Sequence, residues 1–400
     1  MIALCLAGCA RAAIPHDPQP TADQRVAELD WLLDRIAHDD PYAGRLDVAG
    51  IRAHYLARAR AATTRDQWIG VLEDVLGELY DHHVSLGTNT AASPRLVPTG
   101  ADMWGEVVGE RALITEIRRG TAAERAGLRA GMVVTAIGGR PIADAIAARR
   151  PAVTGRDDPE AASWAFRVLL AGTHDQPRRL TACAAPDACH DYTLDAPELA
   201  DAGQPVTSRL IGDRGYIRIE NSLGDSDTVA AFDAALQALA PARVVILDLR
   251  NTPSGGSTEV AEPILGRFVD VPRDYQRIFV PGHDRAPWNK AVAPRAPLDA
   301  RPLIVLVDHW TGSMGEGMAI GLAAMKRATV IGTRMAGLRG GIAEVTLPRS
   351  GITVRFQNEQ LFHIDGTPRE RWVPPVLVEP TGGEPDDPIL ARGLRAAHDE

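Results

Sequence analysis

From residue 205 onward, short uninterrupted apolar runs alternate with helical patterns, and this alternation limits the fold more than any other feature of the chain. The runs "RVVILDL", "PLIVLVDHW" and "TVIGT" are apolar on both faces, which is typical of buried strands. The segments between them, "DTVAAFDAALQAL", "STEVAEPILGRFV" and "GSMGEGMAIGLAAMK", have helical spacing. Continuous apolar strands separated by helices predict an α/β fold with a largely parallel sheet covered on both faces.

Two short polar segments follow the first two of these strands. They are "NTPSGG" and "TGSMGE", and ligands of such sheets bind beyond the carboxyl ends of the strands. In the second segment, Ser313 and Glu316 fit the S-x-x-E capping box of a helix N-terminus. The local sequence therefore leaves two roles open for Ser313, a helix cap and a nucleophile at the edge of the sheet.

Two further units precede residue 199. Residues 21–96 are predicted to be helical, with a capping box at Thr64 and Gln67 that opens an apolar helix. In residues 97–198, "ALITEIRRGTAAERAGLRAGMVVTAIGGRPI" resembles the central part of a PDZ domain, which binds a C-terminal peptide as an extra strand. The loop that binds the carboxylate in that fold is "ADMWGEVV" here, without paired glycines, so peptide binding by this unit stays open.

The chain begins with the short apolar stretch "MIALCLAGCARAA". It resembles the lipobox of a bacterial lipoprotein signal, in which Cys9 would be lipidated. We therefore expect residues 1–20 to be a signal and tether, and the protein to be exported to the cell envelope or periplasm of a bacterium. Cys183 and Cys189 flank "AAPDA" between two alternating runs, which indicates either a disulfide across a hairpin or two free thiols.

Composition excludes several kinds of partner. The net charge is −9 and no dense basic run is present, so we expect neither nucleic acid nor an anionic membrane surface as a partner. No apolar run after residue 20 approaches the length of a membrane span, so a lipid anchor is the only membrane contact expected. No histidine and cysteine spacing suggests a metal site, and we expect no cofactor.

Four segments together resemble one family. "VVILDLRNTPSGGS", "LIVLVDHWTGSMGEGMAIGL", "ATVIGT" and "DGTPRERWVPPVLVEP" occur in the order and approximate spacing of the C-terminal-processing (tail-specific) serine peptidases and the related tricorn-core peptidases. The helices and the PDZ-like unit match the same domain order, so the resemblance covers most of residues 60–380. It implies a crotonase/ClpP-like ββα peptidase core in residues 199–400, with Ser313 as the nucleophile.

Members of this family activate the serine in one of two ways. In the Ser/Lys branch the base is a lysine in a G-K-G stretch, but the matching position here is Leu338 and no lysine follows Lys326. In the tricorn-like branch the base is a histidine from the N-terminal part, with a glutamate near the C-terminus. "LYDHHVSL" offers His83 at the matching place, with His82 as the next candidate, and "DGTPRERWVPP" offers Glu370.

The chemistry of peptide hydrolysis fits these three residue types. A serine hydroxyl becomes a nucleophile when an imidazole accepts its proton, and an acidic partner fixes the tautomer of that imidazole. Ser313, His83 and Glu370 supply one group of each kind. We therefore expect a serine endopeptidase whose partners are protein substrates, cut in unfolded segments or C-terminal tails of exported proteins.

The oxyanion of a tetrahedral intermediate needs backbone N–H donors. Gly255 or Gly256 in "PSGGS" can bring an N–H close to it, because glycine has no side chain. Met314 can donate a second N–H from the first turn of a helix, whose dipole favours negative charge.

Three other interpretations use the same residues. A non-catalytic module could bind a small apolar ligand or a peptide, with the insertion "PRDYQRIFVPGHDRAPWNK" along its pocket. An acyl-CoA enzyme of the crotonase kind shares the core and two oxyanion donors, whereas the lipobox argues against cytosolic chemistry. An α/β-hydrolase is disfavoured because Thr311 replaces the first glycine of G-x-S-x-G. Taken singly, Gly255 and Gly256 fit an ordinary turn, and Glu370 fits a surface ion pair.

Overall fold

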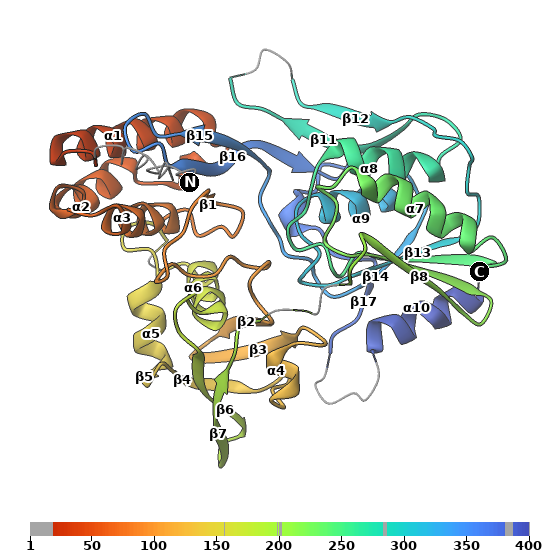
Figure 1. The fold of residues 1–400 in the computed structure, drawn as a ribbon, viewed down its shortest axis with the longest axis horizontal. Coiled ribbons are helices and arrows are strands. Elements are labelled where there is room, and N and C mark those ends of the chain that lie inside the picture. The colour runs from red at the N-terminus through yellow and green to blue at the C-terminus, as the bar shows by residue number, and fades with distance from the viewer. Residues whose placement is uncertain are drawn as a thin grey trace, which may run out of the picture.

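The computed structural model describes residues 19–155, 157–197, 199, 202–282, 286–380 and 387–399. The expected lipidation site, Cys9, lies outside the described residues. Figure 1 shows N-terminal helices at the upper left, a second unit below them and a larger α/β lobe at the right. None of the helices in the described part of the chain combines the length and apolarity that a bilayer crossing requires.

The N-terminal unit is helical, as the sequence predicts. Its elements are α1 (Ala22–Asp39), η1 (Ala43–Arg45), α2 (Val48–Ala61) and α3 (Arg65–Gly77). The predicted capping box at the start of α3 is confirmed, since the Thr64 side chain accepts from the Gln67 N–H and the Gln67 side chain accepts from the Thr64 N–H. After α3 the chain turns into the short strand β1 (Ser85–Leu86), and His82 and His83 lie in this turn.

The second unit is an antiparallel sheet with three helices. The strands run in the order β2-β3-β4-β6-β7, and β5 pairs with β4. Their bounds, with those of the helices, are β2 (Met103–Val108), β3 (Arg111–Ile117), α4 (Ala122–Arg125), β4 (Val133–Ile137), β5 (Arg140–Pro141), α5 (Ile142–Arg149), α6 (Pro159–Ala171), β6 (Arg178–Ala185) and β7 (Ala188–Leu194). Cys183 and Cys189 are cross-strand neighbours on β6 and β7, and a disulfide joins them.

The α/β lobe contains the predicted parallel sheet. The order is β17-β14-β13-β10-β9-β8, and every neighbouring pair is parallel except β8 and β9. The strand bounds are β8 (Val206–Ile211), β9 (Arg214–Ile219), β10 (Val244–Asp248), β13 (Leu303–Val307), β14 (Thr329–Gly332) and β17 (Val376–Leu377).

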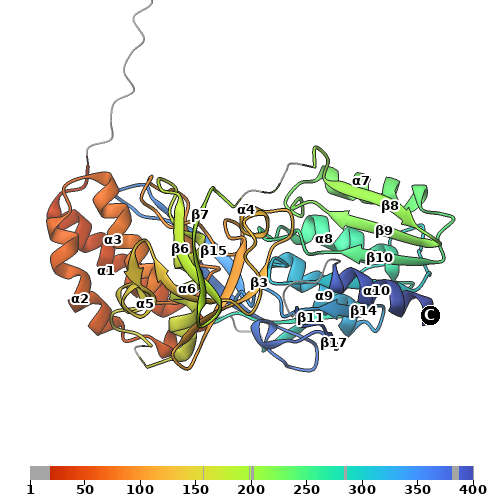
Figure 2. The ribbon, with the colours of Figure 1, turned by 90° about the horizontal axis from the view of Figure 1, so that it is seen from below.

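Helices cover both faces of this sheet, so the prediction is confirmed. Alternate residues of β10 point to opposite faces: Val245 packs against one group of helices, whereas Ile246 packs with α10 (Pro388–Asp399). Figure 1 shows α10 apart from the other helices of the lobe, and Figure 2 shows the N-terminal helices and the α/β lobe at opposite ends of the molecule. The first group consists of α7 (Asp227–Ala238), α8 (Thr258–Leu265), which continues into η2 (Gly266–Phe268), and α9 (Met314–Ala324).

A third sheet connects the α/β lobe to the N-terminal helices. Its order is β1-β16-β11-β12, and β15 also pairs with β16. The bounds are β11 (Arg273–Phe279), β12 (Trp288–Val292), β15 (Gly341–Thr346) and β16 (Thr353–Phe362), which is followed by η3 (Arg369–Arg371). Val354 and Phe356 of β16 are fully buried among residues of α1–α3, so part of the C-terminal half completes the N-terminal core.

Candidate active site

Ser313 lies between the carboxyl end of β13 and the first residue of α9. Its backbone has φ +49°, a value that costs a residue with a side chain on the order of 1–3 kcal/mol. A Cβ at Gly255 would lie 2.4 Å from the Ser313 Cβ, so only glycine fits beside it. The strained turn and the bare neighbour leave the Ser313 hydroxyl accessible at the edge of the sheet.

The His83 side chain contacts Ser313 directly. The His83 Nε2 and the Ser313 Oγ are 3.0 Å apart, and the His83 Nδ1 is 2.8 Å from the backbone carbonyl oxygen of Arg339. A carbonyl oxygen can only accept, so Nδ1 carries the proton and donates it to Arg339. Nε2 is then the acceptor for the Ser313 hydroxyl, which is the tautomer that a general base requires.

The environment of His83 keeps its ring neutral. Burial, together with the nearby positive charge of Arg369, lowers the pKa of His83 to about 3. The backbone N–H of His83 donates to Asp81 Oδ1 at 2.8 Å, which holds the turn before β1. A neutral, fixed imidazole beside a hydroxyl can accept a proton from it.

The other candidate residues of the triad lie elsewhere. Glu370, in η3, has its Oε2 3.5 Å from the Tyr42 hydroxyl, and burial raises the pKa of its carboxyl. Within the described residues no hydrogen bond joins Glu370 to His83, whose Nδ1 is bound to Arg339 instead. His82 is buried and its ring stacks on Trp164 at 6.1 Å between centroids. The structure therefore brings Ser313 and His83 together, but does not bring Glu370 onto the imidazole.

The carbonyl that orients His83 belongs to a loop fixed on both sides. The Arg369 guanidinium donates to the carbonyls of Leu338, at 2.8 Å, and Gly340, which flank Arg339. Since these bonds restrain the peptide units around Arg339, its carbonyl has a defined direction. Sequence reasoning missed this contribution, because any residue type carries a backbone carbonyl.

Glu316 links that loop to the nucleophile. Its carboxylate accepts from the Ser313 N–H at 2.8 Å and from the Gly337 N–H at 3.0 Å. Burial raises the pKa of Glu316 to about 7. The first of these bonds is the glutamate half of the predicted capping box, whereas the second was not expected. Only the S-x-x-E spacing signalled a role for this residue.

Two of the three candidate oxyanion donors have no hydrogen-bond partner among the described residues. Gly255 donates its N–H to the Thr252 carbonyl at 3.0 Å, so this donor is engaged in a turn. The N–H groups of Gly256 and Met314 have no hydrogen-bond partner within the described ranges. The Met314 N–H belongs to the first residue of α9, where the helix dipole is positive.

Comparison with known proteins relates part of the chain to one peptidase family and its fold to solved structures. Residues 213–379 match the family model described as "Peptidase family S41". No curated protein sequence matches the chain.

Solved structures share the fold over nearly the whole chain. The photosystem II D1 C-terminal processing protease is 20% identical, with a TM-score of 0.57 over 89% of this chain and 94% of that one. Mature CPAF complexed with lactacystin is 15% identical, with a TM-score of 0.61 over 94% and 97%. A putative peptidase from Parabacteroides merdae is 15% identical, with a TM-score of 0.52 over 93% and 96%. Residues 213–379 therefore belong to peptidase family S41, and the chain that carries them is a serine-type peptidase.

Proposed function

We propose that this peptidase hydrolyses peptide bonds through Ser313 as nucleophile and His83 as general base. The observation that carries the proposal is the 3.0 Å contact between the His83 Nε2 and the Ser313 Oγ. Nε2 takes the hydroxyl proton while Oγ attacks the carbonyl carbon of the substrate, and the resulting imidazolium gives that proton to the leaving amine. A water molecule then gives a proton to Nε2 and attacks the acyl-enzyme. The imidazolium returns that proton to the Ser313 Oγ as the ester bond breaks.

The free N–H groups of Met314 and Gly256 are the proposed donors to the oxyanion. Each such donor is typically worth about 3–4 kcal/mol of barrier. Gly255, whose own N–H is engaged, would contribute by leaving space above Ser313.

Glu370 is proposed as an acid that acts at a distance. Its carboxylate would stabilise the imidazolium through the electrostatic potential, while the Arg339 carbonyl orients the ring. On this proposal Glu370→Gln lowers kcat by less than about tenfold, whereas the tautomer-fixing acid of a serine triad is worth about 10⁴-fold. A loss of that larger size would show that Glu370 contacts His83 in the working enzyme.

The proposed substrates are unfolded segments and C-terminal tails of exported proteins. The resemblance to tail-specific peptidases supports the substrate class, and a structural neighbour is named a C-terminal processing protease. The disulfide between Cys183 and Cys189 supports an oxidising compartment, as does the lipobox-like sequence at Cys9.

The second unit, which we propose is PDZ-like, has a blocked edge where a peptide strand would add. The edge strand β2 donates from the Val107 N–H to the Ser163 Oγ at 3.0 Å, and its Gly105 carbonyl accepts from the Arg167 Nε at 3.1 Å. Both partners lie on α6. Because these edge groups are already paired, we do not propose that β2 recruits substrate by strand addition.

The test is mass spectrometry of an unfolded protein with an apolar C-terminal tail, incubated with the wild type and with variants. Ser313→Ala and His83→Ala should each abolish detectable cleavage. His82→Phe, which keeps an aromatic ring against Trp164, is the matched control and should cleave. Equal cleavage by the wild type and by Ser313→Ala would overturn the proposal, and so would full activity of His83→Ala.

A further inference from the structure

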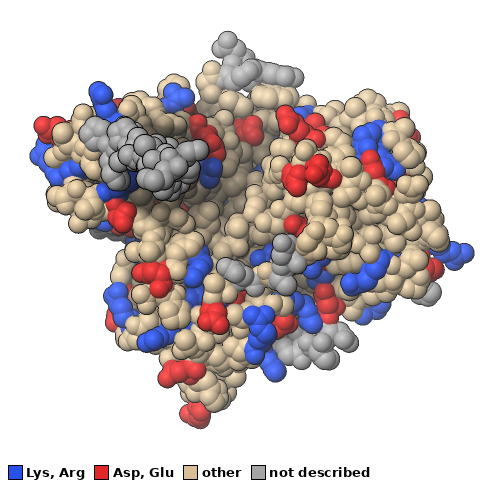
Figure 3. All heavy atoms as spheres, viewed as in Figure 1, with Lys and Arg blue, Asp and Glu red and all other residues tan. Residues whose placement is uncertain are grey.

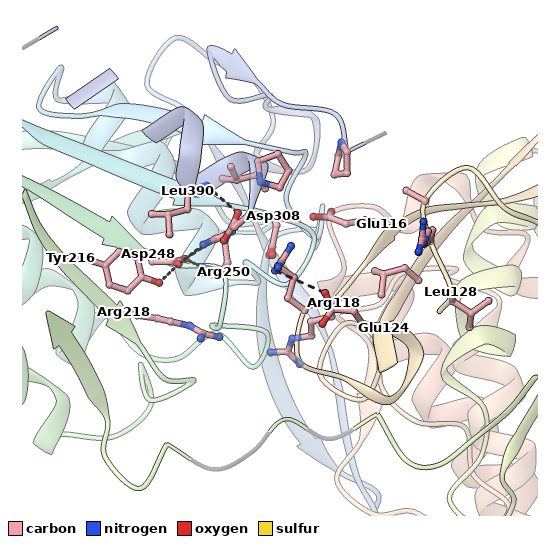
Figure 4. Close-up of a pocket in the computed structure, with 18 of the residues that line it drawn as sticks. Glu116, Arg118, Glu124, Leu128, Tyr216, Arg218, Asp248, Arg250, Asp308 and Leu390 are labelled. Atoms are coloured by element: carbon pink, nitrogen blue, oxygen red, sulfur yellow. Dashed lines mark hydrogen bonds and ion pairs between the residues drawn. The ribbon is translucent and has the colours of Figure 1, made fainter. Parts of the chain in front are cut away.

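A cavity of about 680 Å³ lies away from Ser313, between the second unit and the α/β lobe. The segment from the end of β3 through α4 forms one side, and β8, β9 and the start of α10 form the other. Figure 4 shows the side chains that meet there, among them Arg118 from the second unit and Arg218 from β9. The proposed peptidase mechanism uses none of these residues.

Arg118 is a buried cation that forms no ion pair with a carboxylate among the described residues, although the charge of Asp308 favours its protonated form. The residue is only 7% exposed, and its Nε has no hydrogen-bond partner within the described residues. One terminal nitrogen donates to the Asn251 amide oxygen, which is neutral, and the guanidinium lies 5.8 Å from the centre of the Trp310 ring. Burial lowers the pKa of Arg118 to about 10. A buried charge of this kind is costly unless an anion pairs with it.

Arg218 approaches the same space from the α/β lobe. Its Nε is 3.6 Å from a Glu220 carboxylate oxygen, beyond hydrogen-bond distance, and that oxygen already accepts from the Asn251 amide at 2.7 Å. The positive charge of Arg218 adds to the lowering of the pKa of Arg118. Figure 4 shows the two side chains extending towards the middle of the cavity from opposite sides. Two cations that face each other across a cavity repel unless an anion lies between them.

The carboxyl groups of the cavity have other partners. Asp308 accepts from the Trp310 N–H at 2.8 Å, and burial raises the pKa of its carboxyl. Glu124 accepts from the Gly120 N–H at 2.7 Å. Arg250 binds both Asp248 and Asp387, at 2.7 and 2.8 Å. Glu116 is bound by His309 and by the Thr333 hydroxyl. Burial raises the pKa of Glu116 to about 7, so its negative charge is partly lost at neutral pH.

Part of the cavity wall is apolar. Leu128 and Ile389 are 2% and 3% exposed, and they line the cavity together with Leu390 and the Tyr216 ring. The volume exceeds that of a simple ion and lies near the middle of the range for small-molecule pockets. The lining suits a ligand with a charged group and an apolar body.

We propose that this cavity binds a small organic oxyanion, a carboxylate or a phosphate, whose charged group lies between Arg118 and Arg218 and whose body packs on Leu128 and Ile389. The planar guanidinium groups match carboxylate and phosphate oxygens in pairs. The site is independent of the peptidase chemistry, so its success or failure is separate from that of Ser313 and His83.

Isothermal titration calorimetry at pH 7 and low salt tests the proposal. Succinate and inorganic phosphate are the two probes, and they distinguish a carboxylate site from a phosphate site. We expect one of them to bind with one-to-one stoichiometry, and Arg118→Gln or Arg218→Gln to weaken binding at least tenfold. Arg218 has a side chain 34% exposed, so its variant keeps the test valid where Arg118→Gln fails to fold.

Arg243→Gln is the matched control, because Arg243 is an exposed arginine of the same lobe that does not line the cavity. It should bind the probe as the wild type does. The absence of binding by both probes would overturn the proposal. Binding that survives in both cavity variants, or that Arg243→Gln weakens equally, would also overturn it.

Discussion

At the scale of single residues, the candidate site depends on one side-chain contact and one backbone acceptor. The Ser313 hydroxyl faces the His83 Nε2, and the Arg339 carbonyl takes the proton of the other ring nitrogen. A neutral carbonyl fixes the tautomer as a carboxylate does, but it stabilises the imidazolium less. We therefore expect geometry, more than a paired negative charge, to determine the rate.

The buried His83 ring should keep the rate independent of pH in the mildly acidic range. A base works in its neutral form, and the pKa of His83 is about 3, so the ring stays neutral as the pH falls to 5. An ordinary histidine would be only about 3% neutral at pH 5. Glu316, with a pKa of about 7, titrates in the same interval, and Glu316→Gln removes that titration.

In the Glu316→Gln/Glu370→Gln double variant, which also removes the raised pKa of Glu370, we expect kcat/KM to stay constant between pH 8 and pH 5, measured on a peptide without ionisable side chains. The variant will be slower than the wild type, because the Ser313 and Gly337 N–H groups bind different oxygens of Glu316 and an amide has only one oxygen. An inflection near pH 6.5 in its profile would contradict a buried, neutral His83.

At the scale of elements, the loop between β14 and β15 and the helix α6 have defined functions in the structure. The loop presents the Arg339 carbonyl, and Arg369 holds the carbonyls on either side of it. Helix α6 packs on β2 so closely that a Cβ at Gly105 would lie 2.4 Å from the Phe166 ring.

Arg369→Gln should lower kcat about 10- to 100-fold with little change in KM, because a small displacement of a catalytic group costs up to about 10²-fold. Arg369 is 4% exposed, and the variant leaves the Leu338 and Gly340 carbonyls without their donor. Arg371→Gln, an exposed arginine of the same short helix, is the matched control and should keep wild-type kinetics. Steady-state kinetics give kcat and KM for the two variants, and circular dichroism checks that they are folded. Equal losses of kcat in the two variants would refute a positioning role.

Gly105→Ala should destabilise the protein by about 1–3 kcal/mol, the usual cost of overpacking. The new methyl group would meet Phe166 and Leu170, whereas a Cβ at Gly70 in α3 would meet nothing within 4 Å. Gly70→Ala should therefore stabilise the protein by up to about 1 kcal/mol, since alanine favours a helix. Thermal denaturation compares the two, and shifts of the same sign would contradict the packing described.

At the scale of the whole molecule, the site exists because two parts of the chain share one sheet. His83 precedes β1, Ser313 belongs to the α/β lobe, and β16 pairs with β1 and with β11. Figure 3 shows the surface hollowed between the N-terminal helices and the α/β lobe, with acidic and basic side chains interspersed on this face. The N-terminal helices must therefore remain docked on β16 for His83 to reach Ser313.

Phe356→Ala tests this dependence. Phe356 is fully buried in the core that β16 shares with α1–α3, and its truncation should cost about 3–5 kcal/mol. We expect activity and helical signal to be lost together, at a lower temperature than in the wild type. Val108 is 58% exposed, so Val108→Ala should change neither the temperature at which activity is lost nor the temperature at which the helical signal is lost. Activity that persists after the N-terminal helices have melted would show that His83 is dispensable.

The sequence by itself determined the parallel sheet and the place of Ser313. Apolar runs with a fixed period predict strands and helices because burial depends on spacing along the chain. The end of a parallel strand then predicts where chemistry occurs. The family pattern pointed to His83 rather than to its neighbour His82, and the structure places His83 against Ser313.

Only the tertiary structure decided which groups surround that pair. The Arg339 carbonyl, 256 residues from His83, occupies the position expected for Glu370, and the Gly255 N–H is engaged where a free donor was expected. The cavity around Arg118 and Arg218 likewise forms only where two units meet. The physical reason is that every residue carries a backbone donor and acceptor, whose direction depends on the folded path of the chain and not on residue type.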